Sequence, residues 1–377
     1  MSEFYIGLMS GTSLDGVDGV LAEFSGPKPR VAIHCTAPFA TNLRAELLAL
    51  NTPGSNELHR VALAANALAR VYAQVVVQLL AGAGVSPSQV KAIGAHGQTV
   101  RHRPQEFAAD AQRGIPALGY TLQINNPALL AELTGIDVVA DFRSRDVAAG
   151  GQGAPLAPAF HQEVFGRPGE PVAVLNLGGI ANLSVLGANS TVLGFDCGPG
   201  NALMDHWCQL HTDQPFDAGG AWAASGRVSQ PLLAALLAEP YLSKAPPKST
   251  GRDLFNPDWL IARLKNFATL PPVDVQATLT EFTASACVSS VISYGNDSKS
   301  LIVCGGGALN TCLMQRLQAS LPQVALESSE ARGLPPLQVE ATAFAWLARK
   351  TLNREAGNLA SVTGARGDRV LGAIYPA

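Results

Sequence analysis

Glycine, hydroxyl and carboxylate side chains crowd together in the segment Gly11-Thr12-Ser13-Leu14-Asp15-Gly16-Val17-Asp18, close to the N-terminus. Glycines allow backbone N–H groups to converge on an anion, and the hydroxyls of Thr12 and Ser13 can donate hydrogen bonds to it. Asp15 and Asp18 offer the oxygen ligands that a divalent cation prefers. The segment is therefore predicted to hold nucleotide phosphates and a metal ion, with an ordinary polar hairpin turn as the alternative.

The spacing of Gly11 and Gly16 is that of the glycines in a Walker A loop, but the rest of that motif is missing. Val17 and Asp18 stand where a Walker A loop needs Lys and Ser or Thr, and no helical pattern follows. Strand-like apolar runs flank the turn instead. The segment is therefore interpreted as a phosphate-holding hairpin rather than a P-loop.

A second hairpin with the same plan lies at residues 172–186, where two apolar runs flank a Gly178-Gly179 turn with neighbouring asparagines. Two such hairpins in one chain indicate a duplicated architecture. Downstream, a strand-like run ends at Asp196 and enters the rigid turn Gly198-Pro199-Gly200, ahead of a helical pattern.

Three consecutive glycines, Gly305 to Gly307, follow the buried-type strand 301–304 and precede another helical pattern. Glycines at such a position let a flat ligand approach the backbone closely. Tight packing of a strand against a helix is the alternative explanation. Because the chain has two other turns of the phosphate-binding type, we favour a nucleotide site at this triplet.

Composition predicts a globular protein of two or three domains. The chain has 377 residues, of which 47% are hydrophobic and 15% charged, and this argues against disorder. A net charge of −3 gives no basic surface for nucleic acid.

Neither a membrane span nor a signal peptide is expected, so a cytoplasmic location is predicted. The six cysteines are scattered and none forms a C-x-x-C pair, which disfavours disulfides and zinc.

Strand and helix patterns alternate along the chain, which is typical of α/β proteins. Among them, 126–135 predicts a short helix and 279–294 a longer one. The charged and then glycine-rich stretch 141–155 is the expected passage between domains. The first domain is thus predicted at 1–150, completed by a C-terminal segment from about 341 to 377, and the second at 151–340. Within the second domain, 246–252 is expected to be an exposed loop.

These features resemble the sugar-kinase, Hsp70 and actin superfamily, in which ATP lies in a cleft between two related actin-like, ribonuclease H-like α/β domains. The resemblance becomes closer over seven ordered motifs, which look like the motif series of the anhydro-N-acetylmuramic acid kinase family: 7–18, 95–99, 141–143, 148–156, 176–179, 194–201 and 248–252. The resemblance covers essentially the whole chain, and seven ordered motifs are far more specific than any one of them.

The resemblance implies an enzyme of peptidoglycan recycling that uses ATP, Mg²⁺ and water to convert 1,6-anhydro-N-acetylmuramic acid to N-acetylmuramic acid 6-phosphate. Asp196 is then the expected general base for the water, with a helix-capping role as the alternative. Glu340, at the start of the last helical pattern, matches a second acidic position of the family. A glutamate there can equally be a partner of the helix dipole.

The resemblance also implies two sets of binding residues. Nucleotide binding is expected from Gly11, Thr12, Ser13, Leu14, Asp15, Gly16, Val17, Asp18, Asn176, Gly178, Gly179, Gly305, Gly306, Gly307 and Asn310, with Asp15 and Asp18 at the metal. Sugar binding is expected from His96, Gln98, Asp141, Arg143, Arg145 and Gln152.

Arg143 or Arg145 is expected to grip the lactyl carboxylate of the muramic acid with a fork of donors, whereas His96 can also be a structural histidine. Two other classes remain as alternatives: a nucleotide-switched binding protein of the Hsp70 or actin kind, and a kinase of ordinary hexoses. The expected partner is a small sugar, without nucleic acid or membrane, and a homodimer is left open.

Overall fold

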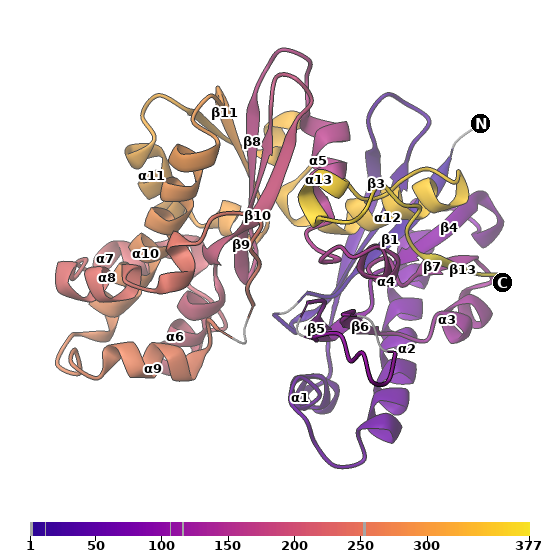
Figure 1. Cartoon of the computed structure of the whole chain (residues 1–377), viewed down its shortest axis with the longest axis horizontal. Coiled ribbons are helices and arrows are strands. Elements are labelled where there is room, and N and C mark those ends of the chain that lie inside the picture. The colour runs from indigo at the N-terminus through magenta and orange to yellow at the C-terminus, as the bar shows by residue number, and fades with distance from the viewer. Residues whose placement is uncertain (1–2, 12, 106, 115–116, 252–253) are drawn as a thin grey trace. The chain divides into compact units, whose positions relative to one another are not determined.

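The computed structural model describes residues 3–11, 13–105, 107–114, 117–251 and 254–377. It divides into two compact units: Met1–Val164 with Gln338–Ala377, and Phe165–Leu337 (Figure 1). Residues 151–164, which were expected in the second domain, thus belong to the first unit, as does the C-terminal segment.

The first unit is built on a six-stranded sheet with the order β13-β7-β4-β1-β2-β3. Strands β1, β2 and β3 form an antiparallel meander, β4 and β7 run parallel to β1, and β13 pairs antiparallel with β7. The strand bounds are β1 Phe4–Met9, β2 Gly16–Glu23, β3 Arg30–Pro38, β4 Val90–Ala95, β7 Val138–Ala140 and β13 Ala373–Tyr375, and a separate hairpin pairs β5 Gln98–Arg103 with β6 Tyr120–Ile124.

Helices cover this sheet and supply its core. Their bounds are α1 Thr41–Ala49, α2 Glu57–Ala83, α3 Pro127–Thr134, α4 Ser144–Ala148, α5 Ala157–Phe165, α12 Val339–Leu352 and α13 Ala360–Thr363. Helix α2 is long and apolar enough to cross a membrane by length and composition alone. Its apolar stripe, however, is buried in the hydrophobic core with residues of β1 and β2 such as Leu8 and Leu21, as expected for an amphipathic core helix.

Helix α12 packs directly on the backbone of the sheet, and two glycines make this approach possible. A Cβ atom built on Gly7 of β1 would lie 1.8 Å from the carbonyl oxygen of Ala341, and one built on Gly94 of β4 would lie 2.0 Å from that of Phe344. Any side chain at either position would push the helix away. The close contact fixes the start of α12 beside the central strands.

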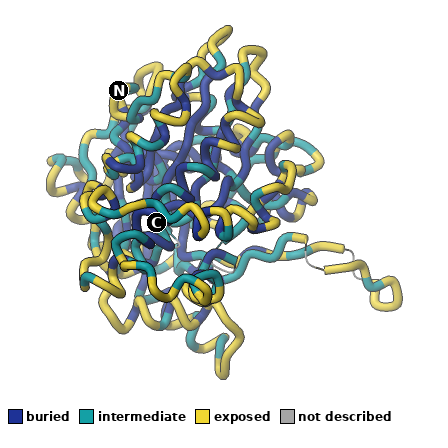
Figure 2. Tube along the Cα trace, turned by 90° about the vertical axis from the view of Figure 1, so that its left-hand side faces the viewer, coloured by how far each residue is buried: buried dark blue, intermediate teal, exposed yellow. Residues whose placement is uncertain are grey.

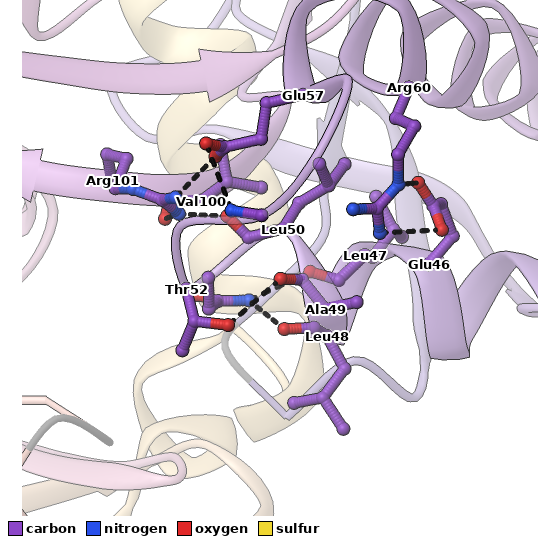
Figure 3. Close-up of polar contacts among 12 residues, drawn as sticks. Glu46, Leu47, Leu48, Ala49, Leu50, Thr52, Glu57, Arg60, Val100 and Arg101 are labelled. Carbon is purple, nitrogen blue, oxygen red and sulfur yellow. Dashed lines mark hydrogen bonds and ion pairs between the residues drawn. The ribbon is translucent and has the colours of Figure 1, made fainter.

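Ion pairs fasten the connection between α1 and α2 (Figure 3). Arg60 of α2 binds Glu46 of α1 through two hydrogen bonds, at 2.7 and 3.0 Å. Arg101 of β5 reaches Glu57 at the start of α2 and also the carbonyl oxygen of Leu50. The β5–β6 hairpin is thereby attached to this connection.

The second unit has a five-stranded sheet with the order β10-β9-β8-β11-β12. Strands β8 to β10 are an antiparallel meander, and β11 and β12 run parallel to β8. This repeats the order β3-β2-β1-β4-β7 of the first unit, so the predicted duplication of hairpin-led α/β halves is confirmed. The bounds are β8 Val172–Leu177, β9 Ile180–Leu186, β10 Val192–Pro199, β11 Ser300–Cys304 and β12 Ala325–Ser328.

One face of the second sheet is covered by a helical layer centred on a long buried helix, α10. The helix bounds are α6 Ala202–Thr212, α7 Ala221–Ser225, α8 Gln230–Leu237, α9 Pro257–Leu264, α10 Pro272–Tyr294 and α11 Thr311–Ser320. Strands β8 and β11 are buried along their whole length. Figure 2 colours buried residues of the chain dark blue and exposed ones yellow. Such strands at the centre of a covered sheet hold the turns at their ends rigidly.

Candidate active site

Three glycine-containing turns meet at one end of the sheet in the second unit. The turn between β8 and β9 accepts backbone hydrogen bonds from the turn after β10: Gly200 N donates to Gly179 O at 3.0 Å, and Asn201 N donates to Gly178 O at 2.8 Å. A Cβ atom on Gly200 would lie 2.2 Å from Gly178 O. Only glycine allows the two turns to approach so closely.

The glycine triplet after β11 is the third of these turns, and its members differ. A Cβ atom on Gly305 would lie 2.5 Å from Asn176 Oδ1, and one on Gly307 would lie 2.5 Å from Leu177 Cβ. Gly306 is exposed, and its nearest neighbour would be Asn201 Nδ2 at 3.6 Å. Packing therefore accounts for Gly305 and Gly307, whereas Gly306 leaves open space of the kind that a ligand needs.

Asn310, expected beside the nucleoside, caps helix α11. Its side-chain oxygen accepts a hydrogen bond from Leu313 N at 3.0 Å. This is the usual role of asparagine at the start of a helix. The cap explains the residue structurally, and its contact with a nucleotide stays a prediction.

Polar side chains form a row across three neighbouring strands of this unit. Asn176 of β8 lies opposite Asn182 of β9, and Asn182 lies opposite Asp196 of β10. Directly opposed residues of antiparallel strands project from the same face of a sheet, and here that face is opposite the helical layer. Sequence reasoning missed Asn182, although its position at the far side of the Gly-Gly turn from Asn176 was a usable signal.

The carboxylate of Asp196 is held from the loop that precedes α9. Thr250 N donates to Asp196 Oδ2 at 2.9 Å, and Asp196 N donates to Lys248 O at 3.2 Å. The hydroxyl of Tyr241 donates to Asp196 O at 2.9 Å. Asp196 also lies at an irregularity of the β9–β10 register, before Gly198. A half-buried carboxylate with so many fixed neighbours has a well-defined orientation.

The expectation that 246–252 is an exposed loop is wrong for Lys248, whose exposed fraction is 7%. Its ammonium donates to Leu242 O at 3.1 Å and lies over the rings of Tyr241 and Phe195, at 5.0 and 5.6 Å from their centres. Burial lowers the pKa of Lys248, while the charge of Asp196 acts in the opposite direction. Cation–π contacts offset part of the free-energy cost of removing this ammonium from water. A sequence pattern does not reveal such contacts. Arg252, in the same motif, lies outside the described residues.

In the first unit, the predicted phosphate turn follows β1. Leu14 has a left-handed backbone with φ of 59°, and its side chain is buried in the core, where it anchors the turn. Gln98 Nε2 donates to Gly11 O at 3.1 Å, and Ser10 Oγ donates to Gly97 O at 3.1 Å. Of the other residues predicted here, Gly11, Ser13 and Gly16 are half-buried, Val17 is buried, and Thr12 lies outside the described residues.

The two expected metal ligands have different surroundings. The Asp18 carboxylate is 48% exposed and lies 3.6 Å from His34 Nε2, whereas that of Asp15 is 76% exposed and lies 3.9 Å from Arg44. No group of three or more His, Cys, Asp or Glu side chains suited to a metal occurs among the described residues. Mg²⁺ is commonly held by one or two carboxylates, with waters and phosphates as its other ligands. The donor set therefore fits Mg²⁺ bound together with a nucleotide.

His96 and Arg143 form the centre of the predicted sugar site. Arg143 donates to His96 Nε2 from Nε at 3.2 Å, and Arg143 Nη1 donates to Gly153 O at 2.8 Å. Burial and, to a smaller extent, the charge of Arg143 lower the pKa of His96 to about 3 and that of His102 to about 4. His96 is therefore a neutral acceptor at neutral pH, and it orients the guanidinium.

The remaining predicted sugar ligands lie on the same segment but are less constrained. Asp141 is exposed, has φ of 59°, and accepts a hydrogen bond from Ser144 Oγ at 2.5 Å. Arg145 is exposed on α4. Gln152 is half-buried, and its backbone N–H donates to Thr363 O at 2.8 Å. Among these residues, the contacts thus fix Arg143 more firmly than Arg145.

Glu340 lies in the first turn of α12 and is half-buried. It precedes Ala341, whose carbonyl oxygen touches the backbone of β1 at Gly7. This places Glu340 next to the central strand that leads into the predicted phosphate turn. This position of Glu340 is compatible with a role as partner of the helix dipole and also with a role in the active site.

Comparison with known proteins identifies the family. A family model described as anhydro-N-acetylmuramic acid kinase matches residues 3–377. The chain belongs to this family. Two relatives named anhydro-N-acetylmuramic acid kinase, from Variovorax paradoxus (strain S110) and Albidiferax ferrireducens (strain ATCC BAA-621 / DSM 15236 / T118), are 70% and 64% identical to it. The alignments cover 100% of this chain in both cases, and 99% and 100% of the two relatives.

A solved structure, the activator of the 2-hydroxyisocaproyl-CoA dehydratase from Clostridium difficile with bound ADPNP, is similar over 92% of this chain and 97% of that chain. Its TM-score is 0.45 and its sequence identity is 12%. Membership of the anhydro-N-acetylmuramic acid kinase family confirms the resemblance drawn from the seven motifs and assigns the chain to the phosphotransferases.

Proposed function

We propose that this chain is an ATP-dependent kinase that converts 1,6-anhydro-N-acetylmuramic acid and water to N-acetylmuramic acid 6-phosphate in peptidoglycan recycling. Family membership over the full length supports the activity. The observation that carries the mechanism is the oriented Asp196 carboxylate beside three glycine turns. The phosphoryl donor is ATP, and consumption of ATP favours a cytoplasmic location.

The reaction joins two events at one sugar. Water attacks C1 and opens the anhydro ring, and the released O6 takes the γ-phosphoryl group of ATP. In this proposal Asp196 accepts the proton of the water, because Thr250 holds one carboxylate oxygen and leaves the carboxylate oriented for proton transfer. Glu340 is the second acidic group at the sugar.

Phosphate-binding turns are assigned in each unit, and we regard the units as the two actin-like domains of the enzyme. In the first unit the phosphates contact the turn at Gly11, Thr12 and Ser13. In the second unit they contact the turns at Gly178 and Gly306. When bound, Mg²⁺ neutralises charge on the phosphate oxygens, and Asp18 with Asp15 supplies the oxygen ligands for it.

The sugar is assigned to the group around Arg143. Its guanidinium is held by His96 and Gly153, and a guanidinium held in place loses less conformational entropy when it binds a carboxylate. Arg143 therefore reads the lactyl carboxylate, with Gln98, Asp141, Arg145 and Gln152 around the ring.

Isotope labelling tests this function. The purified protein is incubated with ATP and the anhydro sugar in ¹⁸O-water, and the product is analysed by mass spectrometry. The proposal predicts N-acetylmuramic acid 6-phosphate with one ¹⁸O at C1. Phosphorylation without ¹⁸O at C1 would indicate an ordinary sugar kinase, and ATP hydrolysis without a sugar phosphate would indicate a nucleotide-switched binding protein.

A further inference from the structure

A fully buried carboxylate lies beside the predicted sugar site, on helix α4. Asp146 has no exposed surface. Its Oδ2 accepts a hydrogen bond from Gly153 N at 2.7 Å, and its Oδ1 accepts from Asn358 Nδ2 at 2.5 Å and Thr363 Oγ1 at 2.7 Å. An unpaired buried carboxylate is very costly, so these three donors are what stabilise it.

These hydrogen bonds join two segments that are far apart in sequence. Gly153 belongs to the glycine-rich loop after α4, whereas Asn358 and Thr363 belong to the C-terminal segment around α13. The loop follows the carboxylate so closely that a Cβ atom on Gly151 would lie 2.2 Å from Asp146 Oδ2. Gln152 N adds a hydrogen bond to Thr363 O at 2.8 Å. The loop is thus held on one side by Asp146 and on the other by the C-terminal segment.

The same loop determines where Arg143 lies. Gly153 donates its N–H to Asp146 and accepts, through its carbonyl oxygen, the hydrogen bond of Arg143 Nη1 at 2.8 Å. Arg143 in turn binds His96. A continuous series of hydrogen bonds therefore runs from Thr363 and Asn358 through Asp146 and Gly153 to the guanidinium.

We propose that Asp146 is a positioning residue for the sugar substrate, which sets the place of Arg143 through Gly153. This inference rests on the proposed function, since it assigns Arg143 to the sugar. An apolar side chain would fill the same space but would not accept the hydrogen bond of Gly153 N. The carboxylate therefore holds the loop in addition to filling space. Because Asp146 has no exposed surface, its effect on the reaction is indirect.

The test is the substitution Asp146→Asn, which keeps the shape of the side chain. Whichever way the amide is turned, its NH₂ group faces a donor, either Gly153 N or Asn358 Nδ2. The displaced loop should raise KM for the anhydro sugar by about 10- to 100-fold while KM for ATP stays within about 2-fold, because small displacements of binding groups have effects of this order. Calorimetry should give the same fold increase in the Kd for the sugar.

A pair of threonine variants controls for stability. Thr363→Val removes one donor to Asp146, whereas Thr351→Val removes a similarly buried hydroxyl that binds Leu347 O and Leu371 O instead. Thr363→Val should raise sugar KM by about 2- to 10-fold, and Thr351→Val should lower the thermal midpoint without changing sugar KM.

The outcomes separate the two proposals. Wild-type protein that does not phosphorylate the anhydro sugar would overturn the proposed function. An active wild type whose sugar KM is unchanged by Asp146→Asn, or by Thr363→Val if the first variant does not fold, would overturn the positioning role alone. Equal rises in the KM values for sugar and ATP would also overturn it, since they would indicate a general structural effect.

Discussion

Thr250 N donates to Asp196 Oδ2 at 2.9 Å, so a loop from a distant part of the sequence orients the predicted catalytic carboxylate. The arrangement is reciprocal, because Asp196 N donates to Lys248 O of the same loop at 3.2 Å. Lys248 is itself fixed by its buried ammonium. The motif 248–252 therefore has a structural reason to accompany Asp196: it holds both the backbone and the side chain of the predicted base.

Substitution of Asp196 by Asn should separate chemistry from binding. The amide keeps the size of the side chain but does not accept a proton from water, so kcat should fall by about 10²- to 10⁴-fold with KM for ATP little changed. The control is Asp258→Asn, at an exposed position in the same unit. Steady-state kinetics measure both variants. Retention of more than about a tenth of wild-type kcat would exclude Asp196 as the base.

The two arginines should differ in substrate selectivity. Arg143→Lys keeps the charge but loses the fork, so it should narrow the ratio of kcat/KM between anhydro-N-acetylmuramic acid and anhydro-N-acetylglucosamine. In the wild type this ratio should be roughly 10 to 200, from a charge-assisted pair of about 1.5 to 3 kcal/mol. Arg145→Lys, at the exposed position, should leave the ratio within about 2-fold. If neither substitution changes the ratio, the carboxylate is recognised elsewhere.

The glycine triplet allows packing and ligand contact to be tested separately. Gly307→Ala would bring a methyl group within 2.5 Å of Leu177 Cβ, so it should lower stability by about 1 to 3 kcal/mol. Gly306→Ala has room for its methyl group and should leave the thermal midpoint within about 2 °C. If the nucleotide lies against Gly306, this variant should still raise KM for ATP several-fold. An unchanged KM for ATP would remove Gly306 from the nucleotide site.

Acid should destabilise the protein through its buried histidines. Burial lowers the pKa of His161 to about 3, compared with about 6.5 in an unfolded chain. Between these pH values the unfolded state binds a proton at this histidine, whereas the folded state does not. The contribution of His161 to the free energy of unfolding is therefore fully present above about pH 6.5 and falls as the pH decreases. The loss between about pH 6.5 and pH 5 is roughly 2 kcal/mol for this histidine.

The measurement is urea unfolding at about pH 7.5 and pH 5 for the wild type and His161→Leu. The variant should lose about 2 kcal/mol less than the wild type over this interval. His59→Ala, at an exposed position, serves as the control and should follow the wild type. An equal loss in the wild type and His161→Leu would show that His161 does not cause the acid effect.

Sequence reasoning recovered the features that local chemistry determines. Helix α3 was expected at 126–135 and spans Pro127–Thr134, because Asn126 caps its start and Gly135 takes a left-handed conformation at its end. Helix α10 was expected from Leu279 but begins at Pro272. It is buried on nearly all sides, so its apolar residues form no single stripe to mark its first turns.

Contacts between distant segments were not predictable in this way. Lys248 reads as a loop lysine, and its burial depends on the rings of Tyr241 and Phe195, which a single sequence does not bring together. Asp146 likewise reads as one charge of the stretch 141–155 that was expected between the domains, and only the C-terminal segment explains why it is buried. For the candidate site, the sequence indicated the glycine turns and Asp196 but not the groups that hold them.

The return of the C-terminal segment to the first unit has a consequence for biosynthesis. Helix α12 covers β1 and β4, and β13 pairs with β7, so the N-terminal unit lacks a layer and an edge strand until α12 and β13 have been translated. The unit Phe165–Leu337 is continuous in sequence. Although domains generally fold in the order of synthesis, in this chain the half that is translated later should complete its fold first on the ribosome.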